Sequence, residues 1–292
     1  MENIQELLGH FSYDFTDEMV KAEVDNILKQ HTSENDNVEV YKQCLNQIDL
    51  TTLSGDDTVK RVATMAQKVN DFKTTFPHLP NVAAICVYPA MVPVVKEYLK
   101  EDIGIASVAA GFPASQTFIE IKVAETAMAV MEGATEIDVV ISIGKFLEED
   151  YQTVYDELCE LRAASRTAHL KVILETGMLQ SMANVKKAAI IAMAAGADFI
   201  KTSTGKTPIA ATPEATWTMC QAIKEWKEKT GKVIGYKPAG GIATTPEAVA
   251  HYTIVKSVLG SEWLTNKLFR FGASRLANNL LSSIEGKEVK YF

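Results

Sequence analysis

The sequence predicts a (β/α)8 barrel, because eight short runs rich in β-branched residues alternate with longer amphipathic stretches along most of the chain. With 292 residues and 47% hydrophobic content, the chain is long enough for one large domain with its own core. A doubly wound open α/β sheet is the alternative that the same alternation allows.

The eight expected strands begin near residue 46, and each is followed by a stretch long enough for a helix. They are residues 46–53, 83–89, 105–113, 136–143, 170–176, 198–205, 232–241 and 268–274. Between them, residues 116–133 carry apolar side chains at three- and four-residue spacing and end at Gly133, as an amphipathic helix does. Residues 183–197 repeat this pattern and stop at Gly196.

Residues 1–43 lie outside the alternation and are expected to form an N-terminal helical extension. Within them, residues 16–31 have the pattern of an amphipathic helix, and the polar residues 32–37 are typical of a linker. We expect the extension to cap the bottom of the barrel or to serve a contact in a homo-oligomer. Residues 44–292 would then be the barrel catalytic domain with a short C-terminal tail.

Composition limits the partners and the location. The net charge of −8 argues against a nucleic-acid or anionic-membrane surface. The four cysteines lack metal-type spacing and are typical of free thiols in a reducing compartment. The N-terminus does not resemble a signal peptide, and charges interrupt every apolar run before it could span a membrane. We therefore expect a cytoplasmic protein with neither nucleic-acid nor membrane partners.

Two lysines on consecutive predicted strands carry the first indication of chemistry, Lys201 in FIKTSTGK and Lys237 in VIGYKPAGG. A second cation about 6 Å away, at an effective dielectric of about 20, disfavours an ammonium by about 2.8 kcal/mol, or about two pKa units. Partial burial is expected to add roughly one more unit. A lysine made neutral in this way can attack an aldehyde or ketone and form a Schiff base.

Strand alternation predicts a carboxylate beside these lysines. In EIDVV, Ile137 and Val139 would face the helices while Asp138 points into the barrel, and the same parity places Lys201 inside. Asp138 would neutralise the lysines as a buried counter-ion, and it could also transfer protons during Schiff-base chemistry. The two roles can coexist.

Glycines follow the last three predicted strands in a pattern that favours phosphate binding. Backbone amides at such loops and helix starts bind anions, and barrels commonly hold phosphate after strands seven and eight. Each glycine alone is more often a turn residue, but together they converge on one side of the barrel. The residues concerned are Gly205, Lys206, Gly240, Gly241, Gly272 and Ser274.

Seven segments together resemble the deoxyribose-phosphate aldolase family, over about residues 44–283. They are DLTTL (49–53), AAICVYP (83–89), ATEIDVV (134–140), LKVILETG (170–177), AGADFIKTSTGK (195–206), GYKPAGG (235–241) and FRFGAS (269–274). The resemblance implies a (β/α)8 barrel that reversibly cleaves 2-deoxy-D-ribose 5-phosphate to acetaldehyde and glyceraldehyde 3-phosphate. It also implies that the reaction needs neither a metal nor another cofactor.

The resemblance also implies roles for individual residues. Lys201 would form the Schiff base, Lys237 would lower its pKa, and Asp138 would serve a proton relay. Asp49 would hydrogen-bond a sugar hydroxyl, and Cys86 would lie near the substrate as a small buried hydrophobic residue. Thr202 would touch substrate or support its loop, and the phosphate would bind to Gly205, Lys206, Gly240, Gly241, Gly272 and Ser274.

The chain departs from the family pattern at two places. Arg275 stands where the family often has a second small hydroxyl residue, and its guanidinium could strengthen phosphate binding. Some relatives end in a tyrosine implicated in proton transfer, whereas here Tyr291 is penultimate and Phe292 is last. We expect a disordered tail, with Tyr291 in the site as the alternative.

Other functions remain open at this point. Another Schiff-base barrel lyase, acting on a keto acid or resembling transaldolase, would use the same lysine chemistry. A sugar-phosphate-binding protein without activity is a second alternative, although it would more readily have lost one of the two lysines or Asp138. A metal-dependent aldolase is not expected, because the five histidines form no ligand cluster in the sequence.

Overall fold

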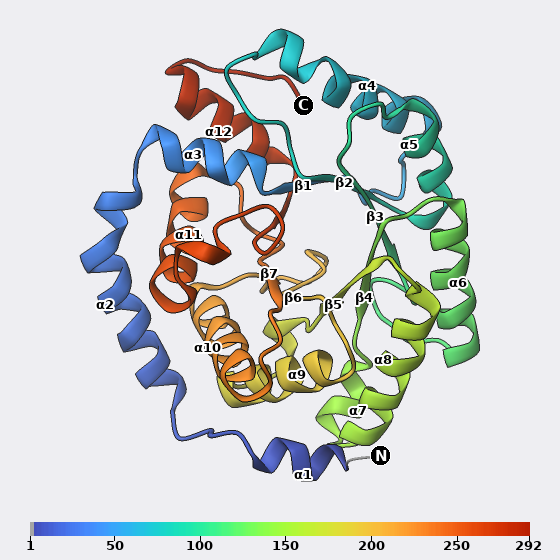
Figure 1. Ribbon diagram of the computed structural model, residues 1–292, viewed down its shortest axis with the longest axis vertical. Coiled ribbons are helices and arrows are strands. Elements are labelled where there is room, and N and C mark those ends of the chain that lie inside the picture. The colour runs from blue at the N-terminus through green and yellow to red at the C-terminus, as the bar shows by residue number, and fades with distance from the viewer. Residues whose placement is uncertain (1–2) are drawn as a thin grey trace.

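The computed structural model describes residues 3–292 and has eight parallel strands surrounded by helices (Figure 1). Met1 and Glu2 belong to the predicted extension but lie outside the described residues. The strands are β1 (Ile48–Thr51), β2 (Ala84–Val87), β3 (Gly104–Ala109), β4 (Glu136–Val140), β5 (His169–Ile173), β6 (Phe199–Lys201), β7 (Gly235–Lys237) and β8 (Phe271–Ala273). β3 and β5 begin one residue before the predicted runs, and the other six strands lie within them. All eight are shorter than the runs, mostly because the carboxyl ends of the runs form loops at the barrel mouth.

The strands form a barrel. Their order is β7-β6-β5-β4-β3-β2-β1-β8, and every neighbouring pair is parallel. Two isolated parallel bridges, Tyr236 to Phe269 and Ala239 to Gly272, join β7 to the β8 segment. The backbone N–H of Arg270 also donates to the Tyr236 carbonyl at 3.0 Å. The predicted (β/α)8 fold is therefore confirmed, and the doubly wound open sheet is excluded.

Helices follow the strands and form the outer layer. They are α4 (Val59–Thr75), α5 (Val92–Tyr98), α6 (Ile119–Glu132), α7 (Ile143–Leu147), α8 (Tyr151–Ser165), α9 (Met182–Ala194), α10 (Pro213–Thr230), α11 (Thr245–Leu259) and α12 (Arg275–Glu285). Short 3₁₀ turns are η1 (Pro89–Met91), η2 (Thr176–Met178) and η3 (Ser261–Trp263). Gly133 ends α6 in the left-handed region at φ +116°, as predicted, because glycine adopts this conformation without a Cβ clash.

The extension forms three helices, α1 (Ile4–Gly9), α2 (Asp17–Asn35) and α3 (Val38–Asn46). Its longest helix, α2, packs on the outside of α10 and α11 rather than across the bottom of the barrel (Figure 1), and the alternative of an oligomer contact stays a prediction. The predicted linker at 32–37 is also wrong in its first four residues, which continue α2. The Asn35 amide donates to the His31 carbonyl at 2.9 Å and to the Thr253 hydroxyl at 3.1 Å, so a tertiary contact with α11 holds the last turn.

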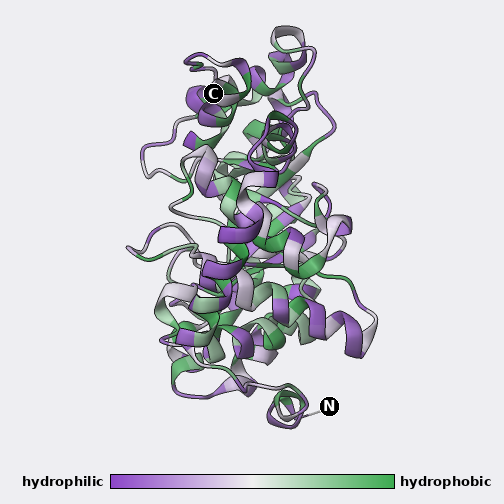
Figure 2. Cartoon of the chain, turned by 90° about the vertical axis from the view of Figure 1, so that its left-hand side faces the viewer, coloured by the Kyte–Doolittle hydropathy of each residue, from purple (hydrophilic) through white to green (hydrophobic). Residues whose placement is uncertain are grey.

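The core lies between the strands and the helices. Ile137 and Val139 of β4 are fully buried in it, while Asp138 points the other way, into the barrel lumen. This is the side-chain alternation that the sequence predicted. Figure 2 shows hydrophobic and hydrophilic residues alternating along the peripheral helices, as amphipathic packing requires. Among residues 3–292, no helix is both long and apolar enough to cross a membrane.

Candidate active site

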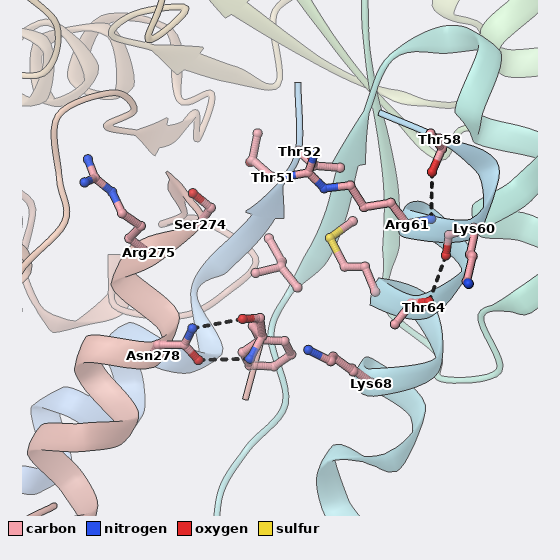
Figure 3. A pocket seen from close by; sticks show the side chains of 13 residues that line it. Thr51, Thr52, Thr58, Lys60, Arg61, Thr64, Lys68, Ser274, Arg275 and Asn278 are labelled. Carbon is pink, nitrogen blue, oxygen red and sulfur yellow. Dashed lines mark hydrogen bonds between the residues drawn. The ribbon is translucent and has the colours of Figure 1, made fainter. Parts of the chain in front are cut away.

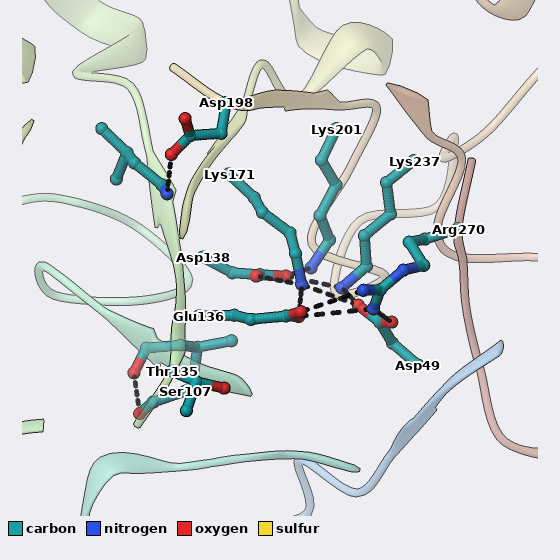
Figure 4. A network of polar contacts seen from close by, with 12 residues as sticks. Asp49, Ser107, Thr135, Glu136, Asp138, Lys171, Asp198, Lys201, Lys237 and Arg270 are labelled. Atoms are coloured by element: carbon teal, nitrogen blue, oxygen red, sulfur yellow. Dashed lines mark hydrogen bonds and ion pairs between the residues drawn. The ribbon is translucent and has the colours of Figure 1, made fainter. Parts of the chain in front are cut away.

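Seven charged side chains meet in the barrel lumen, which Figure 4 shows from close by. They come from five strands and from the residue that precedes β8, and each is at most 7% exposed. Strand register places Asp138 opposite Lys171 and Lys201 opposite Lys237. The full set is Asp49, Glu136, Asp138, Lys171, Lys201, Lys237 and Arg270.

Asp138 lies between the two lysines that the sequence singled out. Its Oδ2 accepts hydrogen bonds from Lys201 Nζ at 2.7 Å and from Lys237 Nζ at 2.8 Å. Its Oδ1 accepts no hydrogen bond from residues 3–292, and the Lys171 ammonium is 3.4 Å away. The sequence therefore placed these three residues together correctly, and one carboxylate oxygen keeps lone pairs available for a further donor.

Asp49 is held by cations on both of its oxygens. Oδ1 accepts from Arg270 Nη1 at 2.6 Å, and Oδ2 accepts from Lys171 Nζ at 2.9 Å and from Lys237 Nζ. Burial disfavours its charge, but the three cations hold its pKa well below the usual range. A bond from Asp49 to a sugar hydroxyl stays a prediction, and it would have to compete with one of these ion pairs.

Sequence reasoning missed Glu136, Lys171 and Arg270, which complete the network. Glu136 accepts from Lys171 Nζ and from Arg270 Nη2, the latter at 3.0 Å. A signal for them exists in the sequence: Glu136 shares the strand parity of Asp138, while Lys171 and Arg270 are single charges within apolar strand runs. A lone charge at a lumen-facing position needs partners from other strands, and that requirement could have found all three.

The three lumen lysines differ in pKa. Burial lowers the pKa of Lys201, and Lys237 lowers it further, while Asp138 opposes both effects. Burial also disfavours the charged forms of Lys171 and Lys237, but their carboxylate neighbours outweigh it and raise the pKa of each. The predicted direction for Lys201 holds, but the predicted order of causes is wrong, because burial contributes more than the second lysine.

Charge balance also favours a neutral Lys201. With every group ionised, the network has four cations, Lys171, Lys201, Lys237 and Arg270, against the three carboxylates of Asp49, Glu136 and Asp138. Loss of one proton leaves three cations against three carboxylates. Lys201 has the fewest carboxylate partners of the three lysines, so it is the group from which removal of a proton costs least.

A cavity of about 400 Å³ opens at the carboxyl ends of the strands, where the active sites of barrel enzymes lie. Of the seven network residues, Lys201 alone lines this mouth cavity. All six residues expected at the phosphate also line it, so the structure brings them together; their binding of phosphate stays a prediction. They are Gly205, Lys206, Gly240, Gly241, Gly272 and Ser274.

Two of these glycines are required by close packing. A Cβ on Gly240, which has φ +83°, would lie 2.8 Å from the Gly205 Cα, so the two loops approach backbone to backbone. A Cβ on Gly272 would lie 2.6 Å from the Ala239 Cβ and 3.2 Å from Lys237 Cε. Gly272 therefore leaves room for the side chain of Lys237.

Thr202 and Cys86 do not line the mouth cavity. The Thr202 hydroxyl accepts from the Ala239 N–H at 2.9 Å and donates to the Ala239 carbonyl at 3.2 Å. These two bonds connect the loop after β6 to the loop after β7. Cys86 packs in a small apolar cluster with Ala106 and Val108, and burial raises the pKa of its thiol. These positions favour structural roles for both.

The C-terminal tail is ordered, so the expectation of a disordered terminus is wrong. The Tyr291 hydroxyl donates to the Lys68 carbonyl at 2.7 Å, and its ring packs edge-on against Phe72 of α4. Tyr291 does not line the mouth cavity, and proton transfer by it stays a prediction that requires the tail to move. Arg275 does line the cavity, as does Arg61 of α4, which the sequence analysis missed because a helical residue carries no strand-parity signal.

Comparison with known proteins agrees with this geometry. The DeoC/LacD family of aldolases matches residues 44–260. A deoxyribose-phosphate aldolase from Mus musculus is 47% identical over 249 residues, covering 82% of this chain and 77% of the relative. One from Homo sapiens is 46% identical over 244 residues, covering 80% and 77%. A solved deoxyribose phosphate aldolase from Aeropyrum pernix, described as a tetramer, has a TM-score of 0.67 at 23% identity and covers 88% of this chain and 96% of its own.

Proposed function

This chain belongs to the DeoC/LacD family of aldolases, and from that premise we propose that it cleaves 2-deoxy-D-ribose 5-phosphate reversibly to acetaldehyde and glyceraldehyde 3-phosphate through a Schiff base on Lys201. One observation carries the assignment of the nucleophile. Lys201 is the lumen lysine that reaches the mouth cavity, and its pKa is lowered, whereas the pKa values of Lys171 and Lys237 are raised. A nucleophilic amine needs both access and a neutral form.

The reaction begins when the neutral Lys201 amine attacks the C1 aldehyde of the open-chain sugar phosphate. Loss of water gives a protonated imine, which is the electron sink. The proton of the C3 hydroxyl is removed, the C2–C3 bond breaks, and its electron pair forms the enamine while glyceraldehyde 3-phosphate leaves. Protonation of the enamine at C2 and hydrolysis of the resulting imine release acetaldehyde and restore the amine.

Asp138 is proposed as the proton relay. Its Oδ1 accepts no hydrogen bond from residues 3–292, so it can accept one from the C3 hydroxyl or from a water between them. Lys171, Lys201 and Lys237 hold its pKa well below the usual range despite burial, so it would pass the proton on rather than keep it. Lys237, bonded to the other oxygen, would stay charged and hold the carboxylate in place.

The substrate phosphate is proposed to bind in the mouth cavity among the loops after β6, β7 and β8. The hydroxyl of Ser274, at the start of α12, makes no capping bond to its own helix and faces the cavity. Lys206 and Arg275 supply positive charge there. A helix start, glycine amides and two cations together suit a dianion.

We also propose that residues 44–292 form the catalytic unit and that residues 1–43 brace its outer helices. Contacts of α2 with α9, α10 and α11 support this division. Assembly into a homo-oligomer is proposed because the Aeropyrum relative is described as a tetramer. A cytoplasmic location is proposed because all four cysteines are free thiols.

Borohydride trapping tests the proposed mechanism. The protein would be reduced in the presence of acetaldehyde and, separately, of pyruvate, and analysed by intact mass and peptide mapping. We expect one reduced two-carbon adduct, on Lys201, with acetaldehyde and none with pyruvate. A pyruvate adduct would favour a keto-acid lyase, and a folded protein without any adduct would reject the Schiff base and favour a sugar-phosphate-binding protein.

A further inference from the structure

A second cavity, of about 570 Å³, lies beside the mouth cavity, between α4 and α12 (Figure 3). The two cavities share five lining residues, Thr51, Thr52, Arg61, Ser274 and Arg275. A ligand here would therefore sit next to the proposed substrate phosphate without occupying its place. We call this the α4–α12 cavity.

The charge of the α4–α12 cavity is positive. Lys60, Arg61 and Lys68 of α4 and Arg275 of α12 line it, and no lining residue has an acidic side chain. Arg61 has ion pairs with Asp56 and Asp57, at 3.3 and 3.5 Å. Among residues 3–292, no ion pair involves Lys60, Lys68 or Arg275, so three cations on two facing helices lack a counter-ion. Such a lining favours an anion.

The floor of the cavity is apolar and built by packing. Leu50, Met65 and Phe292 line it. The Asn278 side chain fixes the backbone of Phe292 with two hydrogen bonds, each of 2.9 Å, and the Phe292 ring stacks on Phe72 at 5.4 Å between centroids. This floor offers an apolar or aromatic group a preformed surface, which inorganic phosphate alone could not use.

We propose that the α4–α12 cavity binds an organic phosphate with an aromatic or aliphatic body. The phosphate would lie among Lys60, Lys68 and Arg275, and the body would rest on the floor. Because Arg61 and Arg275 line both cavities, the bound ligand would compete for the guanidinium groups that face the substrate phosphate, and would repel that phosphate. It would therefore inhibit the enzyme by raising the apparent KM. The binding itself does not rest on the proposed reaction.

The test uses 1-naphthyl phosphate as the probe and the full chain as the protein, with binding followed by calorimetry. Inorganic phosphate and 1-naphthol are the comparison ligands, because the first has only the phosphate of the probe and the second only its aromatic body. We expect the probe to bind at least about tenfold more tightly than either, because both halves of the cavity are used. Equal affinity of the probe and inorganic phosphate would overturn the proposal.

Variants locate the probe. Replacing both Lys60 and Lys68 by Ala removes charges that line only this cavity, and we expect binding of the probe to weaken at least about fivefold. Lys73→Ala is the matched control, because Lys73 also lies on α4 but pairs with Glu101 at 3.2 Å, outside the cavity. Lys206→Ala alters only the mouth cavity and should leave binding of the probe unchanged.

Two outcomes separate this inference from the proposed function. Binding that survives the Lys60 and Lys68 double substitution but is lost in Lys206→Ala would place the probe in the mouth cavity and overturn the inference. The double variant should keep the activity of the unaltered chain without probe and lose most of the rise in apparent KM with it. If the chain cleaved no deoxyribose 5-phosphate, the calorimetric result would still decide the inference.

Discussion

The deep part of the barrel lumen and its mouth each hold a buried lysine, Lys171 and Lys201, whose pKa values are shifted in opposite directions. Lys171 is fully buried beside three carboxylates and has a raised pKa. Lys201, on the next strand, has Asp138 as its one carboxylate partner, lines the mouth cavity and has a lowered pKa. Burial acts against the charge of both. The number of carboxylate partners therefore decides the direction in which the pKa of each lysine shifts, and it is lowest for the lysine proposed as the nucleophile.

The largest effect should follow from Lys201→Met. We expect turnover to fall by about 10⁴-fold or more, because the covalent intermediate can no longer form. The free energy of unfolding should be unchanged or higher. A lysine with a lowered pKa in the folded state destabilises the fold below its ordinary pKa, so at neutral pH its removal relieves that cost. Steady-state kinetics measure the turnover, and urea unfolding measures the stability. A loss of stability as large as that expected for Lys171→Met would mean that Lys201 and Lys171 do not differ in their effect on the fold.

Lys171→Met should have the opposite effect on stability and should destabilise the fold. Its raised pKa stabilises the fold at every pH below its ordinary value, and its removal leaves Asp49, Glu136 and Asp138 short of a cation. We expect the free energy of unfolding to fall by about 3–5 kcal/mol, as when one partner of a buried ion pair is removed. Urea unfolding measures this. A stable variant would mean that Arg270 and Lys237 suffice for the three carboxylates.

Lys237→Met sharpens the comparison by changing only the neighbour of the nucleophile. The proposed mechanism requires neutral Lys201, so kcat/KM should rise with pH and level off below the ordinary lysine pKa of 10.5. Without the second cation, the rising limb should move to higher pH, by less than about two units because burial is the leading cause of the shift. The pH dependence of kcat/KM measures this. If the rising limb of the pH profile did not move, the lowered pKa of Lys201 would be due to burial alone.

The fold was predictable from sequence, and three of the seven network residues were placed from strand parity, for a physical reason. Strand parity is local, so Asp138, Lys201 and Lys237 could be placed in the lumen from their flanking apolar residues. The pairing of Asp49 with Arg270 was not predictable in the same way, because parity places a charge in the lumen without saying which charge it meets, and these two residues are 221 positions apart. Arg61 and the packed position of Tyr291 depend on contacts of α4, which no local pattern specifies.

Tyr291→Phe should have the smallest effect. It removes only the hydroxyl that donates to the Lys68 carbonyl, so we expect the free energy of unfolding to fall by about 1 kcal/mol. Because that hydroxyl lies away from the mouth cavity, kcat should stay within about twofold, which is less than 1 kcal/mol. Chemical unfolding and kcat check both. A tenfold loss of kcat would show that the tail leaves α4 during turnover and brings the Tyr291 hydroxyl into the mouth cavity.

The pairing of β7 with β8 connects the electrostatics of the lumen to the expected course of heat inactivation. Isolated bridges and a few backbone hydrogen bonds, among them the one from Arg270 to Tyr236, join these strands in place of a regular ladder. The Arg270 side chain extends to Asp49 and Glu136 on other strands. The guanidinium thus ties the β8 segment to β1 and β4 beside the β7–β8 joint, where isolated bridges replace a regular ladder. Amide hydrogens at this joint should exchange with solvent before those of β3 and β4, and each opening would admit water beside Lys237. Heat inactivation would then begin as a local loss of the dry environment that lowers the pKa of Lys201, ahead of global unfolding.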